Sequence, residues 1–197
     1  MKIWFPVAAV LLLSACSETP VAKTPEKPPE PLTGRQAFYQ TYGPARAWAI
    51  DAEPLLVRSL DLEELPGDHG KAAAWEATYV SQTKGRLRIF TWSAIEAAGN
   101  LHKGVFASQD EAWRAGGADK PFLIQALKTD TPDVLQTAIA HSDTYFKNVG
   151  PKPHPKFVLE CTARYPDPVW RVYWGDSVAA AQWSVFVDAA TGLYQGR

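Results

Sequence analysis

Residues 73–80 read AAWEATYV, and their pattern decides the fold class. Apolar side chains, two of them aromatic, occupy every second position, while Glu76 and Thr78 lie between them. This period of two is typical of a strand with one buried and one exposed face. Residues 84–85, Lys-Gly, are a turn signal, and residues 86–95 read as the returning strand. The stretch therefore predicts an antiparallel hairpin.

A helix and a further strand precede this hairpin. Thr33 and Gln36 form the T-x-x-Q pattern of a capping box, in which the start of a helix satisfies its free backbone groups. Pro54 ends the helix, because the residue before a proline is disfavoured in the helical conformation. Residues 56–65 then read as a strand, so the order is one helix followed by three strands. The apolar stripe of the helix consists of Ala45, Trp48, Ala49 and Ala52.

The same order recurs near the end of the chain. Thr131 is a good N-cap and Pro132 suits the first helical position, so a helix is expected to begin here, with an apolar face that continues to Phe146. Three strand patterns follow, with Trp170 in the second and Trp183 in the third. These patterns cover residues 156–164, 169–174 and 182–188.

The repeated order predicts an α+β fold of two tandem units, each a helix with a three-stranded antiparallel sheet. The first unit is assigned to residues 34–96 and the second to residues 130–197. Residues 97–129 are the connector, and each unit is expected to form its own sheet.

The connector carries a second capping-box pattern. Ser108 and Glu111 predict a short helix that contains Trp113 and stops at residues 116–117, Gly-Gly. Residues 122–128 are apolar and short, so a strand and a buried helix cannot be distinguished by period, and a strand is favoured. We expect the connector to pack between the two units; the alternative is a ligand-contact loop.

The second unit resembles a PepSY-type unit. The resemblance rests on Trp-Arg-Val at residues 170–172 and on Val-Phe-Val-Asp-Ala-Ala-Thr-Gly at residues 185–192. It implies one helix packed on a small antiparallel sheet of cystatin-like form, and roles that are mostly regulatory or inhibitory, often beside secreted peptidases. Asp188 can accept backbone hydrogen bonds across the final turn, and Gly192 can adopt a positive φ there.

The beginning of the chain resembles a bacterial lipoprotein signal peptide. Lys2 precedes an apolar run of 11 residues, 3–13, which is too short for a membrane-spanning helix of roughly 20 residues. The residues Leu13-Ser14-Ala15-Cys16 match a lipobox. The resemblance implies removal of residues 1–15 and lipidation of Cys16 by a diacylglyceryl group and an amide-linked chain such as palmitate. Ser17 in place of aspartate favours the periplasmic face of the outer membrane.

Residues 16–33 are expected to be a tether behind the lipidated Cys16. Five prolines alternate with charged residues between positions 20 and 31, which leaves little to bury and favours an extended polyproline-like chain. At about 3.1 Å per residue such a chain reaches roughly 50 Å.

Charge and cysteine content exclude several classes of protein. Without residues 1–15 the chain carries 19 basic and 21 acidic residues, so nothing indicates a nucleic-acid partner. Only Cys161 remains besides the lipid site, so no internal disulfide is possible. Its apolar strand neighbours predict a buried, inert thiol rather than a nucleophile.

The four histidines do not predict chemistry. None of His69, His102, His141 and His154 has metal-ligand spacing to a second ligand. The run His141-Ser142-Asp143 is not a triad, because adjacent helical residues point in different directions. We therefore predict no catalytic residue, no metal and no cofactor.

Four residues are predicted to contact a partner. Trp92 and Trp113 are candidates because tryptophan is favoured at binding hot spots. His102 and Lys103 lie in a polar stretch beside Val105, and functional residues concentrate on loops.

The sequence thus indicates a non-catalytic, lipid-anchored binding or regulatory module of the cell envelope. Its expected partner is a protein or peptide, which an exposed sheet edge could accept by strand addition. The alternatives are a structural subunit of an envelope assembly and, less favoured, a hydrolase.

Overall fold

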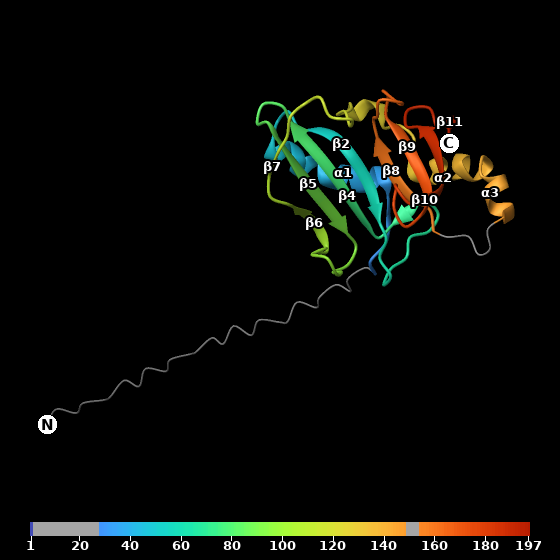
Figure 1. The fold of residues 1–197 in the computed structure, drawn as a ribbon. Helices are drawn as coiled ribbons and strands as arrows, with labels where there is room; N and C mark the ends of the chain where they lie inside the picture. Colours follow the sequence, from blue (N-terminus) through green and yellow to red (C-terminus); the bar gives the residue numbers. More distant parts are fainter. Residues whose placement is uncertain (2–27, 149–153) are drawn as a thin grey trace.

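The computed structural model describes residues 1, 28–148 and 154–197. It is an α+β fold with three helices and a nine-stranded antiparallel sheet (Figure 1). The predicted signal peptide, Cys16 of the predicted lipobox and most of the predicted tether lie outside the described residues. No helix in the described part of the chain is long and apolar enough to cross a membrane.

Strands dominate the fold. The helices are α1 (Gly34–Trp48), α2 (Thr131–Ala140) and α3 (Asp143–Asn148), and a 3-10 turn covers Ile124–Ala126. The strands are β1 (Leu32–Thr33), β2 (Glu53–Leu60), β3 (Lys71–Ala72), β4 (Ala74–Ser81), β5 (Arg86–Ser93), β6 (Gly104–Ala107), β7 (Glu111–Ala112), β8 (Lys156–Glu160), β9 (Val169–Gly175), β10 (Ala181–Asp188) and β11 (Tyr194–Gly196).

The two halves share a single sheet, so the prediction of two tandem units with separate sheets is wrong. The strand order is β11-β10-β9-β8-β2-β4-β5-β6, with β7 also on β5, and β1 and β3 form a separate pair. The halves join where β2 pairs with β8 and Val57 lies opposite Leu159. Two separate three-stranded sheets would expose four edges, each a row of unpaired backbone groups. Joining β2 to β8 removes two of these edges.

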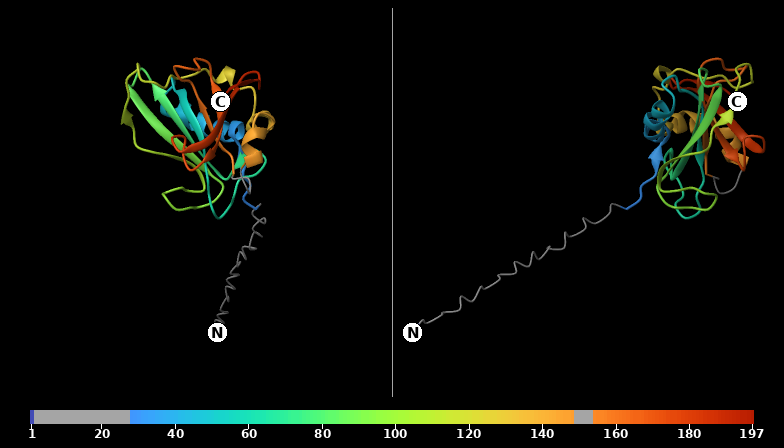
Figure 2. Two further views of the ribbon diagram at one scale, coloured as in Figure 1. Left: turned by 45° about the vertical axis from the view of Figure 1, so that its right-hand side comes forward. Right: turned by 90° about the vertical axis from the view of Figure 1, so that its left-hand side faces the viewer.

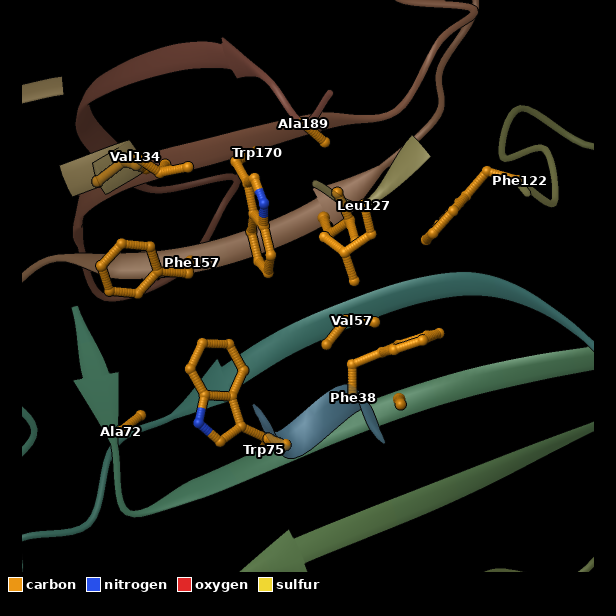
Figure 3. Close-up of a cluster of buried hydrophobic side chains, with 14 of the residues drawn as sticks. Phe38, Val57, Ala72, Trp75, Phe122, Leu127, Val134, Phe157, Trp170 and Ala189 are labelled. Atoms are coloured by element: carbon orange, nitrogen blue, oxygen red, sulfur yellow. The ribbon is translucent and has the colours of Figure 1, made fainter. Parts of the chain in front are cut away.

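The helices cover one face of this sheet and leave the other face uncovered (Figures 1 and 2). Helix α1 packs on β2, β4 and β5, and α2 packs on β9 and β10. Side chains of both halves point toward each other in the core, where Trp75, Val57 and Phe38 face Trp170 and Leu127 (Figure 3).

Two tryptophans tie the sheet to the starts of the helices. The indole N–H of Trp75 donates to the carbonyl of Leu32 at 3.0 Å, and that of Trp170 donates to the carbonyl of Thr129 at 3.1 Å. Each accepting residue directly precedes the N-cap of its helix. The two rings meet edge to face with centroids 6.4 Å apart. A fully buried indole needs such an acceptor, because its N–H would otherwise be desolvated without a partner.

The starts of the two helices also bond to each other. The capping box of Thr33 and Gln36 is confirmed. The second helix is capped by Asp130 and not, as predicted, by Thr131. The Asp130 carboxylate accepts from Thr33 Oγ1 at 2.7 Å and from the Arg35 N–H at 3.0 Å, so one anion stabilises the N-termini of both helices. Thr131 Oγ1 instead accepts from the Gly34 N–H at 2.9 Å.

Gly34 is required by this close approach. A Cβ at this position would lie 2.6 Å from the Trp170 ring and 2.8 Å from the Thr131 methyl group. Any larger residue would push the two helix starts apart.

The connector differs most from expectation. The predicted short helix that contains Trp113 and stops at residues 116–117 is wrong, because Glu111–Ala112 is strand β7 and Ser108 Oγ accepts from the Ile89 N–H of β5. Residues 104–112 pair along the outer edge of β5 and do not lie between the halves. The predicted strand over 122–128 is a 3-10 turn instead, and Phe122 and Leu127 reach the core from either side of it. Pairing with a free sheet edge outweighs a local capping pattern.

In the second half, the predicted helix differs from the structure and the predicted final turn agrees with it. The expected helical face that continues to Phe146 is interrupted, since α2 ends at Ala140 and α3 begins at Asp143. The final turn is confirmed: Asp188 Oδ1 accepts from the Thr191 N–H at 2.7 Å, and Gly192 has a φ of 73°.

Candidate functional site

The candidate site lies at the outer end of the sheet. Strand β6 is the last strand on this side, and it pairs with residues Phe90–Ser93 of β5. The link between the two strands turns tightly, with an Ala97–Leu101 bridge and Asn100 at a φ of 61°. We call this region the β6 margin and define it by Trp92, Glu96, His102, Lys103, Val105 and Phe106.

An exposed aromatic ring is the main feature of the β6 margin. Phe106 is 46% exposed, and the His102 ring lies against it with centroids 4.6 Å apart. His102 Nδ1 is 3.0 Å from the Glu96 carboxylate, whose other oxygen accepts from the Lys103 N–H at 3.0 Å. These contacts hold His102 beside Phe106 at the surface.

Glu96 is the charged centre of the margin. Its pKa lies below the usual range, first because the Lys103 backbone N–H donates to the carboxylate and then because of the hydrogen bond and charge of His102. An ionised Glu96 therefore accepts from both neighbours at neutral pH.

Trp92 supports the margin from the core side. It lies opposite Trp75 on one side and opposite Val105 on the other. Its ring is partly buried and packs against both hydrophobic clusters of the molecule. The role of Trp92 as a partner contact stays a prediction. In the structure its ring packs on the core side of the sheet, on the opposite face from Phe106.

Trp113 lies far from the other predicted residues. Its N–H donates to the carbonyl of Gly85 at 3.0 Å, at the opposite end of β5 from Trp92. The seven residue-to-residue steps from Gly85 to Trp92 span about 23 Å of extended strand. The structure thus brings Trp92, His102 and Lys103 together and places Trp113 elsewhere.

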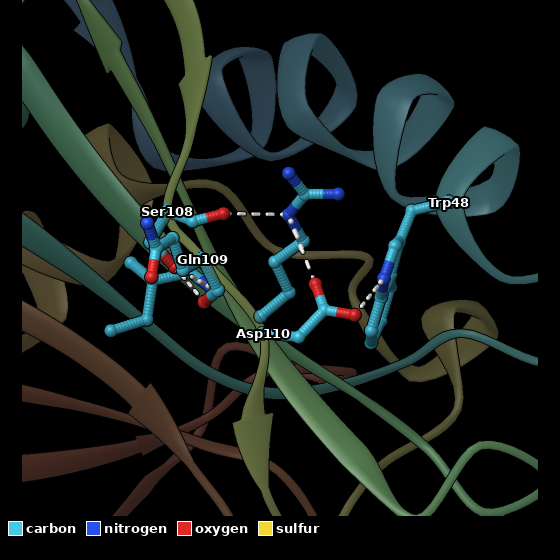
Figure 4. A network of polar contacts seen from close by, with 6 residues as sticks. Trp48, Ser108, Gln109 and Asp110 are labelled. Atoms are coloured by element: carbon cyan, nitrogen blue, oxygen red, sulfur yellow. Dashed lines mark hydrogen bonds and ion pairs between the residues drawn. The ribbon is translucent and has the colours of Figure 1, made fainter.

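A polar network that the sequence did not indicate holds the connector against β5, between the end of the strand near Trp92 and the end near Trp113 (Figure 4). Asp110 lies between β6 and β7 and accepts from Trp48 Nε1 of α1 at 3.2 Å. Arg88 Nε donates to the Ser108 carbonyl at 2.8 Å and lies 3.5 Å from the Asp110 carboxylate. No sequence pattern could have indicated this network, because Trp48, Arg88 and Asp110 are far apart in the chain.

A charged row continues from Phe106 across the uncovered face. In register, Phe106 lies opposite Thr91, Thr91 opposite Glu76, and Glu76 opposite Arg58. Arg58 and Glu76 form an ion pair at 2.9 Å. A partner on Phe106 would therefore also meet a polar surface beside it.

The remaining histidines are dispersed. His69 lies 3.1 Å from Asp68, His141 stacks on Tyr194 with centroids 4.0 Å apart, and His154 is exposed. His154 lines three shallow hollows together with Asp61, whose carboxylate pairs with Lys156 at 3.0 Å. Within residues 28–148 and 154–197, no group of three or more His, Cys, Asp or Glu side chains could hold a metal ion.

Cys161 lies in the core, as predicted. It is 1% exposed, and burial raises the pKa of its thiol to about 11, with Asp167 and Glu160 adding to the shift. The thiolate is the reactive form, so this thiol is inert near neutral pH.

Comparisons of the chain with protein-family models, curated proteins and solved structures return no match.

Proposed function

We propose that this chain is a lipid-anchored, non-catalytic binding or regulatory module of the bacterial cell envelope. In this proposal Cys16 holds it on the membrane, and the β6 margin recognises a protein or peptide partner. The observation that carries the proposal is the exposed Phe106 ring beside His102 at the end of the sheet.

The surroundings of Phe106 support this role. An aromatic side chain at an interface contributes large apolar contact area, and its worth rises where neighbours exclude water. His102 and Lys103 add polar groups around Phe106, as in the rim of an interface. Among the described residues no strand pairs with the outer edge of β6, so this edge could accept an extended segment.

The regulatory part of the proposal rests on the PepSY-like second half. Here α2 packs on β9 and β10, and the Asp188 turn closes the last hairpin, which supports the likeness. We propose that residues 130–197 form a PepSY-like unit whose strands β8, β9 and β10 have merged with those of the first half.

A photo-crosslinking amino acid at position 106 tests the margin in intact cells. We expect a specific protein adduct from position 106 and none from position 123, where Leu123 is equally apolar and 66% exposed but lies away from the margin. His102→Ala should weaken the adduct. Equal adducts from both positions, or none, would contradict the proposal. A stable complex of fixed stoichiometry would favour a structural subunit instead.

Fractionation of a Cys16→Ser variant tests the anchor separately. The thiol is the expected attachment point, so the variant should appear in the soluble periplasmic fraction or remain unprocessed. The anchor proposal fails if mature-sized Cys16→Ser protein is still membrane-bound.

A further inference from the structure

The opposite end of the sheet is covered by very little chain. Strand β10 runs from Ala181 to Asp188, but β11 pairs only with its residues Phe186 and Val187. The register shifts between these two pairs. In the described part of the chain, residues 181–185 of β10 therefore have no strand on their outer side.

The short strand β11 also sits over an unsatisfied polar atom. The hydroxyl oxygen of Tyr165 is buried and has no hydrogen-bond partner among the described residues. A Cβ on Gly196 of β11 would lie 3.1 Å from this hydroxyl, and Gly196 has a φ of 143°, which side-chain-bearing residues rarely adopt. A buried hydroxyl without a partner opposes folding of the state that buries it. Strand β11 thus pairs irregularly with β10 and lies directly against this hydroxyl.

Two arginines mark the uncovered face of this edge. Arg171 Cζ lies 5.4 Å from the centre of the Phe186 ring, and Arg164 Cζ lies 5.1 Å from that of Tyr165. Neither arginine forms a salt bridge within the described residues. The Arg171 guanidinium donates to Ser184 Oγ at 3.1 Å and to the Val178 carbonyl at 3.2 Å, which holds it on this face of the edge. Of the nearby carboxylates, Asp188 is bonded to the N–H groups of its own turn, and Asp167 lines the same hollow as Arg164. Burial raises the pKa of Glu160, and the charge of Arg171 opposes this shift.

The helix side of the edge is apolar. Trp183 and Val185 of β10 belong to the core or pack against it. Beside them, Ile139 of α2, which packs on β10, is 40% exposed. A strand laid along β10 would meet apolar side chains on this side and guanidinium groups on the other. Since side chains of a strand alternate between its faces, a matching segment alternates apolar and acidic residues.

We propose that β11 is a replaceable strand, and that an extended segment of a partner polypeptide, alternating apolar and acidic residues, pairs along β10 in its place. Seven residues of the partner then cover positions 181–187, where β11 covers two. Displacement of Gly196 frees the Tyr165 hydroxyl to bond to the incoming chain or to water. This site is independent of the β6 margin.

Hydrogen–deuterium exchange on the full chain tests the exchange of strands directly. The probe is a seven-residue peptide that alternates valine and glutamate; its controls carry lysine for glutamate, or proline at the centre. With the glutamate peptide, deuterium uptake should rise in residues 194–197 and fall in residues 181–185. The control peptides should change neither. Unchanged uptake in both segments overturns the proposal.

Two variants measure the competition by β11. A chain that ends at Leu193 should bind the glutamate peptide at least tenfold more tightly than the full chain, because no internal strand competes. Tyr165→Phe removes the unsatisfied hydroxyl, so it should bind at least threefold more weakly while its denaturation midpoint stays equal or rises. Tyr165→Phe decides the question if the shortened chain does not fold.

The outcomes separate the possible occupants. The proposal of a replaceable strand is overturned if the full and shortened chains bind the glutamate peptide with equal affinity. It is also overturned if the full chain binds the lysine peptide as tightly as the glutamate peptide. A second copy of the chain is the alternative occupant. In that case the shortened chain dimerises in sedimentation experiments, and deuterium uptake of residues 181–185 falls as the protein concentration rises without peptide. This result would overturn the proposal of a partner polypeptide. Loss of the position-106 adduct bears only on the β6 margin, so the two proposals fail separately.

Discussion

In the first half of the molecule, Trp75 bonds to the residue before the N-cap of α1; in the second half, Trp170 does the same for α2. The N-caps Thr33 and Asp130 then bond to each other at 2.7 Å. The halves are therefore alike where they meet, and their shared centre depends on two indoles and one carboxylate.

At their outer ends the halves differ. The edge of β5 is paired from Arg86 to Ser93 by β6, Ser108 and β7. The edge of β10 is paired at two residues by β11. Similar helix-and-sheet halves can therefore differ in how much of their outermost long strand is paired.

The two tryptophans at the centre should give the largest effects. We expect Trp75→Ala and Trp170→Ala each to lower the free energy of unfolding by about 3–5 kcal/mol, because each removes a fully buried ring. Urea denaturation measures both. Nearly equal losses of unfolding free energy would support the view that the two tryptophans play the same part in each half. A loss below about 1 kcal/mol at either position would contradict it.

A matched pair of glycines in α1 tests the contact between the helix starts. Gly34→Ala should destabilise by about 1–3 kcal/mol, since its Cβ would collide with Trp170 and Thr131. Gly43→Ala, in the same helix with no atom beyond its chain neighbours within 4 Å of the added Cβ, should change the stability by less than about 1 kcal/mol, because the gain in helix propensity is opposed by the contact of the Cβ with Pro44. Thermal unfolding of the two variants distinguishes a crowded position from a merely helical one. A stabilising Gly34→Ala would show that the helix starts are not in close contact.

The outer edge of the first half should respond more weakly. Asp110→Ala removes partners of Trp48 and Arg88, and we expect a loss of about 0.5–1 kcal/mol because these groups are partly exposed. Glu111→Ala, whose exposed side chain lies one residue further on, is the control and should change the denaturation midpoint little. Equal denaturation midpoints for Asp110→Ala and Glu111→Ala would show that the Asp110 network does not stabilise the connector.

The smallest effect at neutral pH concerns Asp51, which holds the turn between β4 and β5. Hydrogen bonds from Ser81 Oγ and then from the Thr83 N–H lower the pKa of this carboxylate from 3.8 to about 2. A lowered carboxyl pKa stabilises the fold above the unfolded-state value, and this contribution is lost as the pH falls from about 4 to about 2. Asp51→Asn should flatten the midpoint profile in that window. If the denaturation midpoint of Asp51→Asn falls with pH as steeply as that of the parent, Asp51 does not contribute to the loss of stability in acid.

Local features were predictable where neighbouring residues determine them. The capping box of Thr33 and Gln36, the alternation in β4 and the Asp188 turn are confirmed, because each depends on residues within a few positions. The burial of Cys161 followed from the apolar face of its strand segment. The capping pattern of Ser108 and Glu111 failed because the free edge of β5 offered backbone partners that a local pattern does not record.

The sequence by itself determined the first helix and the three main strands of each half and which of their faces are buried, since periodicity records burial directly. It did not indicate the short strands β1, β3 and β11. Only the tertiary structure decided that β2 pairs with β8, that the connector covers β5, and that β10 is left largely open. The physical reason is that strands pair through backbone N–H and C=O groups, which nearly every residue carries, so the choice of neighbour leaves little mark on the side chains. The Phe106 and His102 contact became visible for the same reason, once β6 had taken its place at the end of the sheet.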